Sequence, residues 1–132
     1  MKKGTILWAD DDPDDLMLMR QILDNDDKYD IVEATNGREA LDYLQNIPRG
    51  EKLPCLIILD MNMPVLNGRE TLRILKDDER LRNVPVVVFT TSNSELDKMY
   101  CKKFDVEMVT KPPSYNQLRE VVTRLLSFCS PD

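Results

Sequence analysis

The chain has 132 residues, the length of one ordinary domain, and no apolar stretch approaches the ~20 residues needed to cross a bilayer. Hydrophobic residues make up 42% and charged residues 32%, which excludes a disordered or collagen-like chain and favours a globular one. The formal net charge of −6 argues against a nucleic-acid-binding module, because such modules normally carry a basic face.

Acidic residues are concentrated in the first half of the chain. Residues 1–66 contain 14 Asp and Glu against 7 Lys and Arg, whereas residues 67–132 contain 10 against 11. The excess includes a run at positions 10–15. A solvated helix start, where carboxylates face the positive end of the helix dipole, explains Asp14 and Asp15. We expect Asp10 and Asp11 to have a different role, for the reason given below.

Cysteine and histidine usage limits the chemistry further. The three cysteines, at positions 55, 101 and 129, are scattered and lack CxxC spacing, so we expect reduced, mostly buried thiols in a cytosolic protein. Lys2 and Lys3 lead only to a short apolar run before the acidic residues, so no signal peptide is visible. The chain contains no histidine, which excludes a Ser-His-Asp triad, a histidine metal site and a histidine phospho-carrier of its own.

Apolar strands and amphipathic helices alternate along the chain. Strands are expected at 5–9, 30–34, 55–59, 86–89 and 107–110, and helices are expected to begin at Pro13, Asn36, Asn67, Ser94 and Ser114. Three of these helix starts carry Glu or Gln three residues after the cap, which is typical of a capping box. Residues 45–54 form a polar loop. Continuous apolar strands that alternate with helices predict an α/β fold: a doubly wound parallel sheet of five strands covered on both faces.

Polar side chains follow four of the five predicted strands. Asp10 and Asp11 come after the first strand, Asp60 after the third, Thr90 after the fourth and Lys111 after the fifth. In open parallel sheets the ligand site lies outside the carboxyl ends of the strands. Each of these residues alone is most simply a turn, cap or surface residue. Their joint placement at four strand ends instead predicts one shared pocket.

Three carboxylates in one pocket repel one another unless a cation is present. Ligands that are all oxygen favour Mg²⁺ over zinc, and Lys111 supplies one further positive charge. Asp60 is the expected nucleophile, because it ends the central apolar strand and because carboxylates can form covalent aspartyl phosphates. Thr90 and Lys111 are expected to bind the phosphoryl oxygens. Phosphoryl transfer asks a protein mainly for alignment and charge neutralisation, which this pocket offers.

These pieces together resemble the response-regulator receiver family of two-component signalling over essentially the whole chain. The resemblance is carried by Asp10-Asp11, the segment Asp60-Met-Asn-Met-Pro-Val-Leu-Asn-Gly68, Thr90 and Lys111-Pro112. It implies a flavodoxin-like receiver fold with strand order 2-1-3-4-5. The loop at 45–54 and the Thr-Thr-Ser at 90–92 are similar to the single-domain regulators associated with phytochrome-type kinases. Residues 1–132 are accordingly expected to form a single receiver domain with no output domain.

The resemblance also implies a metal site and its ligands. Asp60 is the implied phosphoacceptor, and Asp11 and Asp60 are the implied Mg²⁺ ligands together with the backbone carbonyl of Asn62. Asp10 is implied to hold the ion through water.

Two further expectations come from the family near the phosphoryl-binding residues. Thr90 is implied to move on activation, and the Lys111–Pro112 peptide is implied to be cis. The aromatic residue that the family often has three positions before the lysine is Met108 in this chain.

The resemblance implies a signalling protein and not an enzyme acting on other substrates. Its phosphoryl donor is expected to be a sensor histidine kinase or phosphotransfer protein, which fits the absence of histidine here. Output is expected through contact with a downstream protein on the face of the last two helices and fifth strand, where Tyr100, Lys102 and Lys103 are candidates. We expect a cytoplasmic location with no nucleic-acid or membrane partner, and the sequence leaves both monomer and homodimer open.

Other functions fit fewer of these residues. Asp10 and Asp12 fit the D-x-D spacing of a metal-dependent phosphatase, in which Asp10 would be the nucleophile and Asp60 would be secondary, but the chain is too short for the cap module that such enzymes often carry. An unphosphorylated interaction module is disfavoured because every pocket residue is present. A flavin carrier is disfavoured because the chain lacks a Gly-rich phosphate loop.

Overall fold

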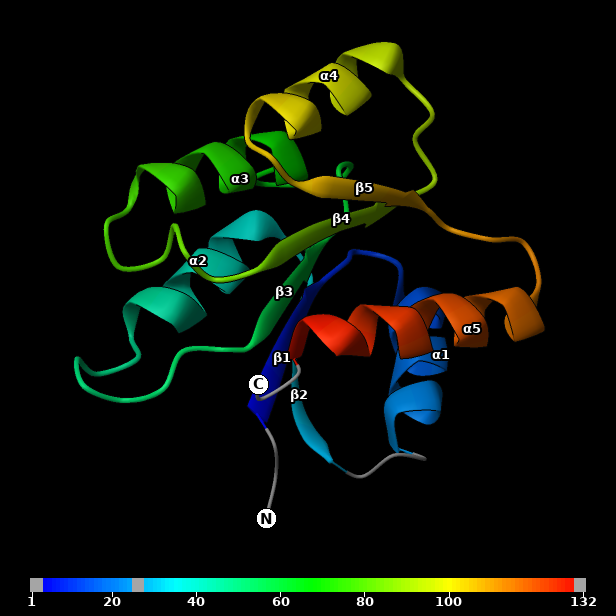
Figure 1. The fold of residues 1–132 in the computed structure, drawn as a ribbon, viewed down its shortest axis with the longest axis horizontal. Helices are drawn as coiled ribbons and strands as arrows, with labels where there is room; N and C mark the ends of the chain where they lie inside the picture. Colours follow the sequence, from blue (N-terminus) through cyan, green and yellow to red (C-terminus); the bar gives the residue numbers. More distant parts are fainter. Residues whose placement is uncertain (1–3, 25–27, 130–132) are drawn as a thin grey trace.

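The computed structural model describes residues 4–24 and 28–129, and in these ranges strands and helices alternate as predicted (Figure 1). The strands are β1 (Gly4–Ala9), β2 (Tyr29–Ala34), β3 (Leu56–Leu59), β4 (Val86–Thr90) and β5 (Glu107–Thr110). The helices are α1 (Pro13–Asp24), α2 (Gly37–Gln45), α3 (Gly68–Asp77), α4 (Glu95–Lys103) and α5 (Tyr115–Leu125), followed by the short 3-10 helix η1 (Leu126–Cys129). Each predicted strand is confirmed to within one residue at either end.

All five strands are parallel and lie in the order β2-β1-β3-β4-β5, as expected. The chain first winds from β1 outward to β2, and then crosses to β3 and winds outward the other way. The reversal falls between β1 and β3, where Ala9 pairs with Leu59 at the carboxyl ends of the two strands. A crevice at that point is the standard ligand position of a doubly wound sheet.

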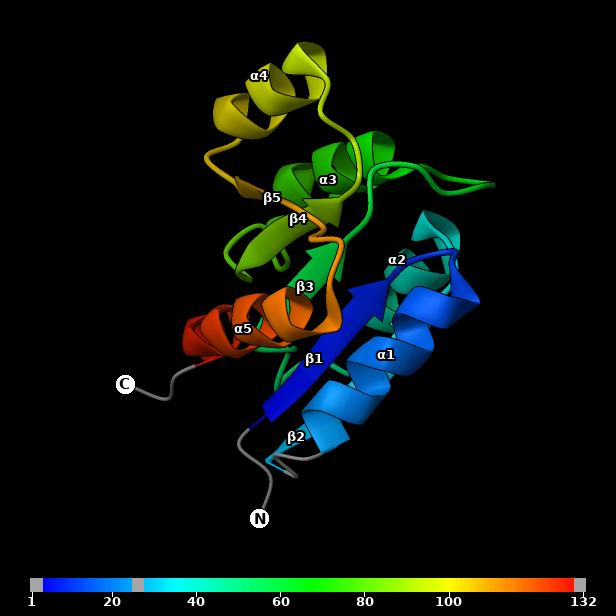
Figure 2. The same ribbon diagram turned by 90° about the vertical axis from the view of Figure 1, so that its right-hand side faces the viewer.

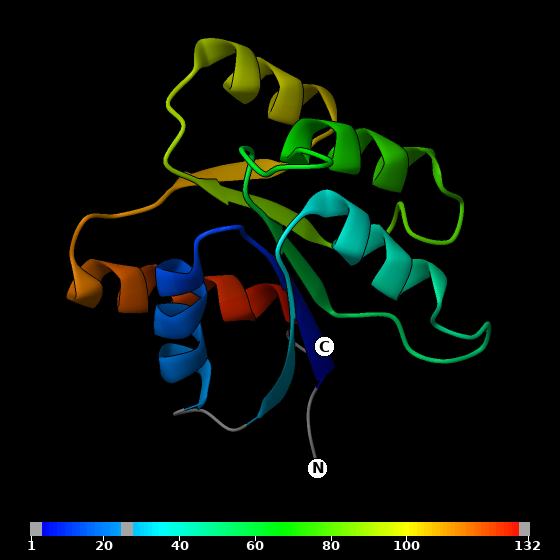
Figure 3. The same ribbon diagram turned by 180° about the vertical axis from the view of Figure 1, so that it is seen from behind.

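Helices cover both faces of the sheet, and side chains alternate between two cores. The helices α1 and α5 cover one face, and α2, α3 and α4 cover the other (Figures 2 and 3). Ile6 and Trp8 belong to the core on the α1 and α5 face, whereas Leu7 and Ala9 belong to the core on the other face. Both faces of the central strands are therefore dry, which explains why those strands are continuously apolar in the sequence. Among the described residues, no helix is long and apolar enough to cross a bilayer.

The repeated quartet Asn-Gly-Arg-Glu begins α2 and α3 in the same way. The side-chain oxygens of Asn36 and Asn67 each accept a hydrogen bond of 2.9 Å from the backbone three residues later. The glycine after each cap is required by close packing. A Cβ at Gly37 would lie 2.6 Å from the carbonyl oxygen of Leu66, and a Cβ at Gly68 would overlap the backbone of Asp60. The start of α3 therefore rests directly on the Asp60 backbone.

Two of the three cysteines are disulfide-bonded, so the prediction of three reduced thiols is wrong for this pair. Cys55 and Cys129 are bridged with a Cα–Cα distance of 4.9 Å across a sequence separation of 74. The physical reason is tertiary: the residue before β3 and the end of η1 meet at the amino-terminal edge of the sheet. Cys101 is a free, buried thiol, as expected, and burial raises its pKa to about 11.

The disulfide predicts a simple thiol count. In denaturant without reductant, a thiol reagent should modify one cysteine per chain, Cys101, and after reduction it should modify three. Reduction should also lower the free energy of unfolding by up to about 4 kcal/mol, because the bridge closes a long loop in the unfolded chain. Mass spectrometry of the labelled chain makes the measurement. Three reactive thiols in protein that was never exposed to reductant would contradict the bridge.

Candidate functional site

The predicted strand-end residues do converge at the carboxyl edge of the sheet. The backbone N–H of Asp10 donates to the carbonyl of Ala34, and that of Asp60 donates to the carbonyl of Ala9, both at 3.0 Å. These bonds extend the sheet ladder by one residue past β1 and β3. Both carboxylates are therefore held by rigid backbone at the point where the strand order reverses.

Asp10, Asp11 and Asp60 form a cluster in which one carboxylate oxygen of each lies within 4.8 Å of the others. Asp10 is fully buried and Asp60 is 7% exposed, whereas Asp11 faces solvent. The cluster is therefore closed on the side of the sheet and open on the side of Asp11. Three hard oxygen donors in this arrangement fit a small divalent cation.

The ammonium group of Lys111 lies in the pocket. Its Nζ lies 2.7 Å from Asp10 Oδ2, 2.8 Å from Asp15 Oδ2 and 3.0 Å from Asp60 Oδ2, and its side chain is 9% exposed. Burial by itself would lower the pKa of Lys111, but the hydrogen bonds and charges of the carboxylates outweigh burial and raise that pKa above its usual value. Lys111 is therefore held fully charged at the point where Asp10 and Asp60 meet.

Asp15 is a site residue that the sequence pattern does not predict, because a carboxylate in the first turn of a helix is ordinarily solvated. Its carboxylate pairs with Lys111, whereas Asp14 beside it is exposed. A signal was available: Asp15 lies four residues before the buried Met19, so both point from the same face of α1 toward the sheet. The pocket therefore holds four carboxylates and one ammonium group.

This crowding changes the ionisation of Asp10. Burial raises its pKa to about 6, and the charge of Asp60 adds to the rise, while hydrogen bonds from Lys111 and from the Asp12 backbone reduce it. Asp12 itself is exposed and accepts a 2.9 Å hydrogen bond from the Asp14 N–H, which is an ordinary helix-start contact.

Thr90 and Asn62 complete the inner surface of the site. The Thr90 hydroxyl oxygen accepts a 3.2 Å hydrogen bond from the Ser92 N–H, and Thr90 is fully buried. The Thr90 carbonyl accepts the Lys111 N–H at 2.8 Å, which ties the ends of β4 and β5 together. The Asn62 N–H lies 3.4 Å from Asp60 Oδ1, a weak contact for a carboxylate.

The expectation of a cis Lys111–Pro112 peptide is wrong, because the described residues contain no cis peptide bond. An X-Pro bond prefers trans by only about 0.5–1 kcal/mol, so the surrounding structure decides the isomer and the dipeptide alone does not. Lys111 reaches the three carboxylates with a trans bond.

The loop after Asp60 contains a backbone position that the sequence did not reveal. Val65 has φ of +66°, and the Leu66 N–H donates to the Pro64 carbonyl at 2.6 Å. A hydrogen bond that spans three residues around a positive φ has the pattern of a classic γ-turn, which is rare. A positive φ is also costly for a β-branched residue such as valine. Val65 is 80% exposed, so packing of its side chain offsets little of the cost. Such outliers cluster at functional sites.

Comparison with known proteins agrees with the geometry. Residues 6–123 match the family model of the response regulator receiver domain. The chain belongs to this family. It is 32% identical over 131 residues to the response regulator Rcp1 of Synechocystis sp., with 93% of this chain and 86% of the relative covered. It is 36% identical over 96 residues to the probable methanogenesis regulatory protein FilR2 of Methanothrix harundinacea, with 70% and 61% covered. The chain thus spans only about three fifths of FilR2.

Solved structures of phytochrome response regulators have the same fold as this receiver domain. The phosphorylated cyanobacterial phytochrome response regulator RcpA superposes with a TM-score of 0.86 at 32% identity, covering 95% of this chain and 92% of that one. The Mn²⁺-bound form of Rcp1 superposes with a TM-score of 0.84 at 30% identity, covering 95% and 93%. Receiver domains pair with histidine kinases or phosphotransfer proteins, and they are signalling domains.

The raised pKa of Asp10 leads to a stability prediction. Asp10 is protonated more readily in the folded state, with a pKa of about 6, than at its ordinary value of 3.8, so the folded state binds more protons between these pH values. The free energy of unfolding therefore falls as the pH rises through this window, and Asp10→Asn avoids that loss. In metal-free buffer at pH 7.5 we expect the substitution to stabilise the protein by about 1–3 kcal/mol, measured by urea titration.

Asp14→Asn is the matched control, since Asp14 is an exposed carboxylate at the same helix start. It should change the stability by less than about 0.5 kcal/mol. The gain for Asp10→Asn should shrink toward zero at pH 4. An equal gain at pH 4 and pH 7.5 would rule out the buried charge as its cause.

Proposed function

We propose that this receiver domain accepts a phosphoryl group on Asp60 from a phosphohistidine donor, with Mg²⁺ as cofactor. The observation that carries the proposal is the position of the Lys111 ammonium, which bonds Asp60 and Asp10 at once beside the oxygen cluster that includes Asp11. Such a site combines a carboxylate nucleophile, a fixed positive charge and ligands for a divalent cation. Those are the components that phosphoryl transfer requires.

Asp60 is the better nucleophile because one of its oxygens is free to react. Its Oδ2 is held by Lys111, while Oδ1 has, within residues 4–24 and 28–129, only the 3.4 Å contact with the Asn62 N–H. Asp10, the nucleophile of the phosphatase alternative, has a side chain that is 1% exposed and has both oxygens hydrogen-bonded. A phosphorus atom can therefore approach Asp60 Oδ1 more easily than either oxygen of Asp10.

The transfer forms one bond and breaks one bond. A lone pair of Asp60 forms the new P–O bond, the P–N bond of the phosphohistidine breaks, and its electron pair returns to the imidazole nitrogen of the donor. Lys111 would pair with one phosphoryl oxygen and the Thr90 hydroxyl would donate to another, which compensates for the charge that arrives. Thr90 would leave its contact with Ser92 to do so.

Asp11, Asp60 and the backbone carbonyl of Asn62 would hold Mg²⁺ directly, and Asp10 would hold it through water. The donor set fits, because the three carboxylates supply hard oxygens within 4.8 Å of one another and their negative charge exceeds what Lys111 neutralises. When bound, the ion neutralises the carboxylates and aligns the phosphoryl oxygens.

In this proposal the domain signals in the cytoplasm by protein contact. A sensor histidine kinase or phosphotransfer protein supplies the phosphoryl group, and no nucleic acid or membrane takes part. The output face is formed by α4, β5 and α5, and Tyr100, Lys102 and Lys103 are its candidate contact residues. Monomer and homodimer are both compatible with this mechanism.

Covalent labelling tests the phosphoacceptor. Acetyl phosphate should modify the wild-type chain only when Mg²⁺ is present, and Asp60→Asn should abolish the modification, because it removes the proposed nucleophile, the carboxylate that Lys111 holds at the end of β3. Mass spectrometry of the intact chain and of its peptides gives the measurement. Asp10→Asn should retain a label on Asp60. Labelling that survives in Asp60→Asn and disappears in Asp10→Asn would favour the phosphatase alternative.

Metal binding should stabilise the fold in a saturable way. A ligand that binds only the folded state adds RT ln(1 + [L]/Kd), which is about 2.7 kcal/mol at one hundred times Kd. We expect the melting temperature of the wild type to increase with Mg²⁺ concentration as this relation requires. Asp11→Asn should lose most of that increase. Asp14→Asn, an exposed carboxylate on α1, should keep it. An unchanged Mg²⁺ response in Asp11→Asn would show that the ion binds elsewhere.

A further inference from the structure

A buried polar network joins the end of β4 to α4 and α3. Asp97 lies in the first turn of α4 and is 3% exposed. Its Oδ2 accepts a 2.7 Å hydrogen bond from the Ser92 hydroxyl, and its Oδ1 pairs with the Arg69 guanidinium. We refer to Ser92, Asp97 and Arg69 as the Asp97 network.

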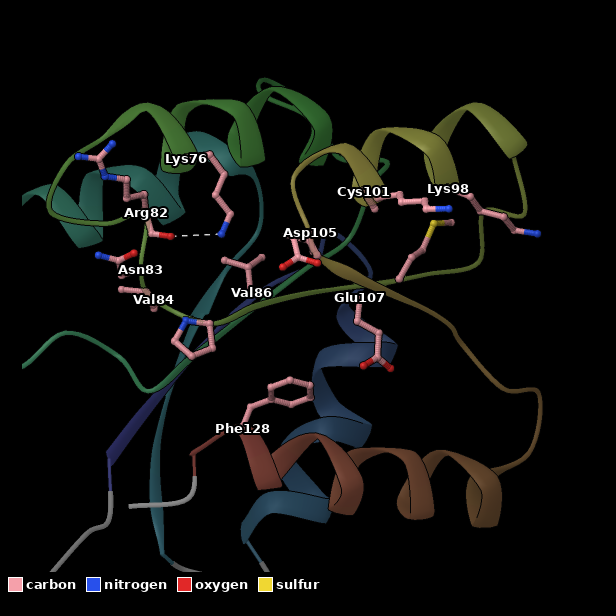
Figure 4. Close-up of a pocket in the computed structure, with 14 residues that line it drawn as sticks. Lys76, Arg82, Asn83, Val84, Val86, Lys98, Cys101, Asp105, Glu107 and Phe128 are labelled. Atoms are coloured by element: carbon pink, nitrogen blue, oxygen red, sulfur yellow. Dashed lines mark hydrogen bonds between the residues drawn. The ribbon is translucent and has the colours of Figure 1, made fainter. Parts of the chain in front are cut away.

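The network is a main attachment of α4, because this helix buries few residues. Only Asp97 and Cys101 are buried in this helix, whereas Leu96 and Met99 are 75% and 65% exposed. A cavity of about 700 Å³ lies between α4, β5 and η1, and Figure 4 shows Lys98 and Cys101 on one side of it and Phe128 on the other. The buried Cys101, the half-buried Tyr100 and one buried ion pair therefore hold α4 beside this cavity.

Asp97 is held as a charged group. Burial by itself would raise its pKa, but the hydrogen bonds from Ser92 and Arg69 outweigh burial and lower the pKa below its ordinary value. Removing either partner would leave a buried carboxylate undercompensated, which is costly in a protein interior. The position of α4 is therefore sensitive to the position of Ser92.

Ser92 also contacts Thr90, the residue proposed to bind the phosphoryl group. The Ser92 N–H donates to the Thr90 hydroxyl oxygen at 3.2 Å, while the Ser92 hydroxyl donates to Asp97. One residue thus connects the reacting pocket to α4 through two hydrogen bonds. Ser92 also contacts the N-cap of α4, since the Ser94 N–H donates to the Ser92 hydroxyl oxygen at 3.3 Å.

Arg69 gives the network a second link to the acceptor. It follows Gly68, which packs on the backbone of Asp60. The Tyr100 hydroxyl donates to the Arg69 carbonyl at 3.0 Å, and the Tyr100 ring lies 6.0 Å from the guanidinium. The aromatic position three residues before Lys111 is instead Met108, which is half-buried among the side chains beneath α2, α3 and α4.

We propose that Asp97 is a positioning residue that couples Thr90 to α4 through Ser92, and that this polar network performs the switching for which the chain lacks an aromatic residue at position 108. The inference rests on the proposed function. When Thr90 turns toward a phosphoryl oxygen, Ser92 loses the acceptor of its N–H and shifts with the loop. Asp97 then loses a partner, and α4 is released from α3. The helix α4 would thus have two arrangements, attached to α3 or released from it, and coupling between distant sites requires such a two-state element.

The coupling must act in both directions, because linkage between two binding equilibria is reciprocal. If the Asp97 network stabilises the unphosphorylated arrangement, weakening it favours the phosphorylated one. Asp97→Asn should therefore bind beryllofluoride, a phosphoryl analogue, about fivefold more tightly than the wild type in the presence of Mg²⁺. A residue with a purely structural role would give the opposite result, since damage to the fold weakens binding.

Hydrogen exchange of residues 95–103 tests the release of α4. In the wild type, beryllofluoride with Mg²⁺ should speed exchange of these amides. In Asp97→Asn, exchange should already be fast without the analogue and should change little when it is added. Glu95→Gln is the matched control on the same helix turn, because the Glu95 side chain is 82% exposed and pairs only with Lys98 among the described residues. It should behave as the wild type does.

Arg69→Gln provides a second test through the other partner of Asp97, and it keeps the inference falsifiable if Asp97→Asn does not fold. It should raise beryllofluoride affinity and α4 exchange in the same direction. Wild-type affinity and exchange in both folded variants would overturn the coupling role and leave the phosphoacceptor assignment intact. Failure of the wild type itself to bind beryllofluoride would overturn both the inference and the proposed function.

Discussion

The Lys111 ammonium lies among the carboxylates of Asp10, Asp15 and Asp60, and the arrangement of the site depends on it. Asp10 follows β1, Asp15 lies in α1 and Asp60 follows β3. The one ammonium group, which follows β5, therefore joins three other parts of the fold. Without it the acidic groups would repel one another at the carboxyl edge of the sheet. With it they still carry surplus negative charge, which makes the pocket a site for a divalent cation and, once that ion is bound, for a phosphoryl group.

Two features at the site lower the stability of the folded protein. Asp10 is a fully buried acid whose pKa is raised to about 6, and Val65 occupies a backbone conformation that β-branched residues rarely adopt. The remainder of the fold offsets these costs through apolar cores on both faces of the sheet. Trp8 of β1 and Phe89 of β4 pack edge to face in the core on the α1 and α5 side, just before Asp10 and Thr90 in their segments. The pocket thus rests on rigid strands, as a site that aligns reacting groups should.

The α4 helix differs from the others in how it is held. The helices α2, α3 and α5 each bury three or more residues, whereas α4 buries one apolar residue and one carboxylate. A helix with so few apolar contacts belongs to the low-stability part of a structure, from which switching elements are drawn. Its neighbour β5 is short and lies at the edge of the sheet. The proposed output face therefore coincides with the part of the molecule that local interactions control most easily.

The sequence alone determined the strands, the sheet class and the residues that meet at the carboxyl edge, because apolar runs and residues that follow strands are local signals. It identified Asp10, Asp11, Asp60, Thr90 and Lys111 as neighbours, and the structure brings them to one edge. Only the tertiary structure decided which distant groups pair: Asp15 with Lys111, Asp97 with Arg69, and Cys55 with Cys129. It also decided the trans peptide at Pro112. These features depend on contacts across the fold or on energy differences of about 1 kcal/mol, which no local pattern records.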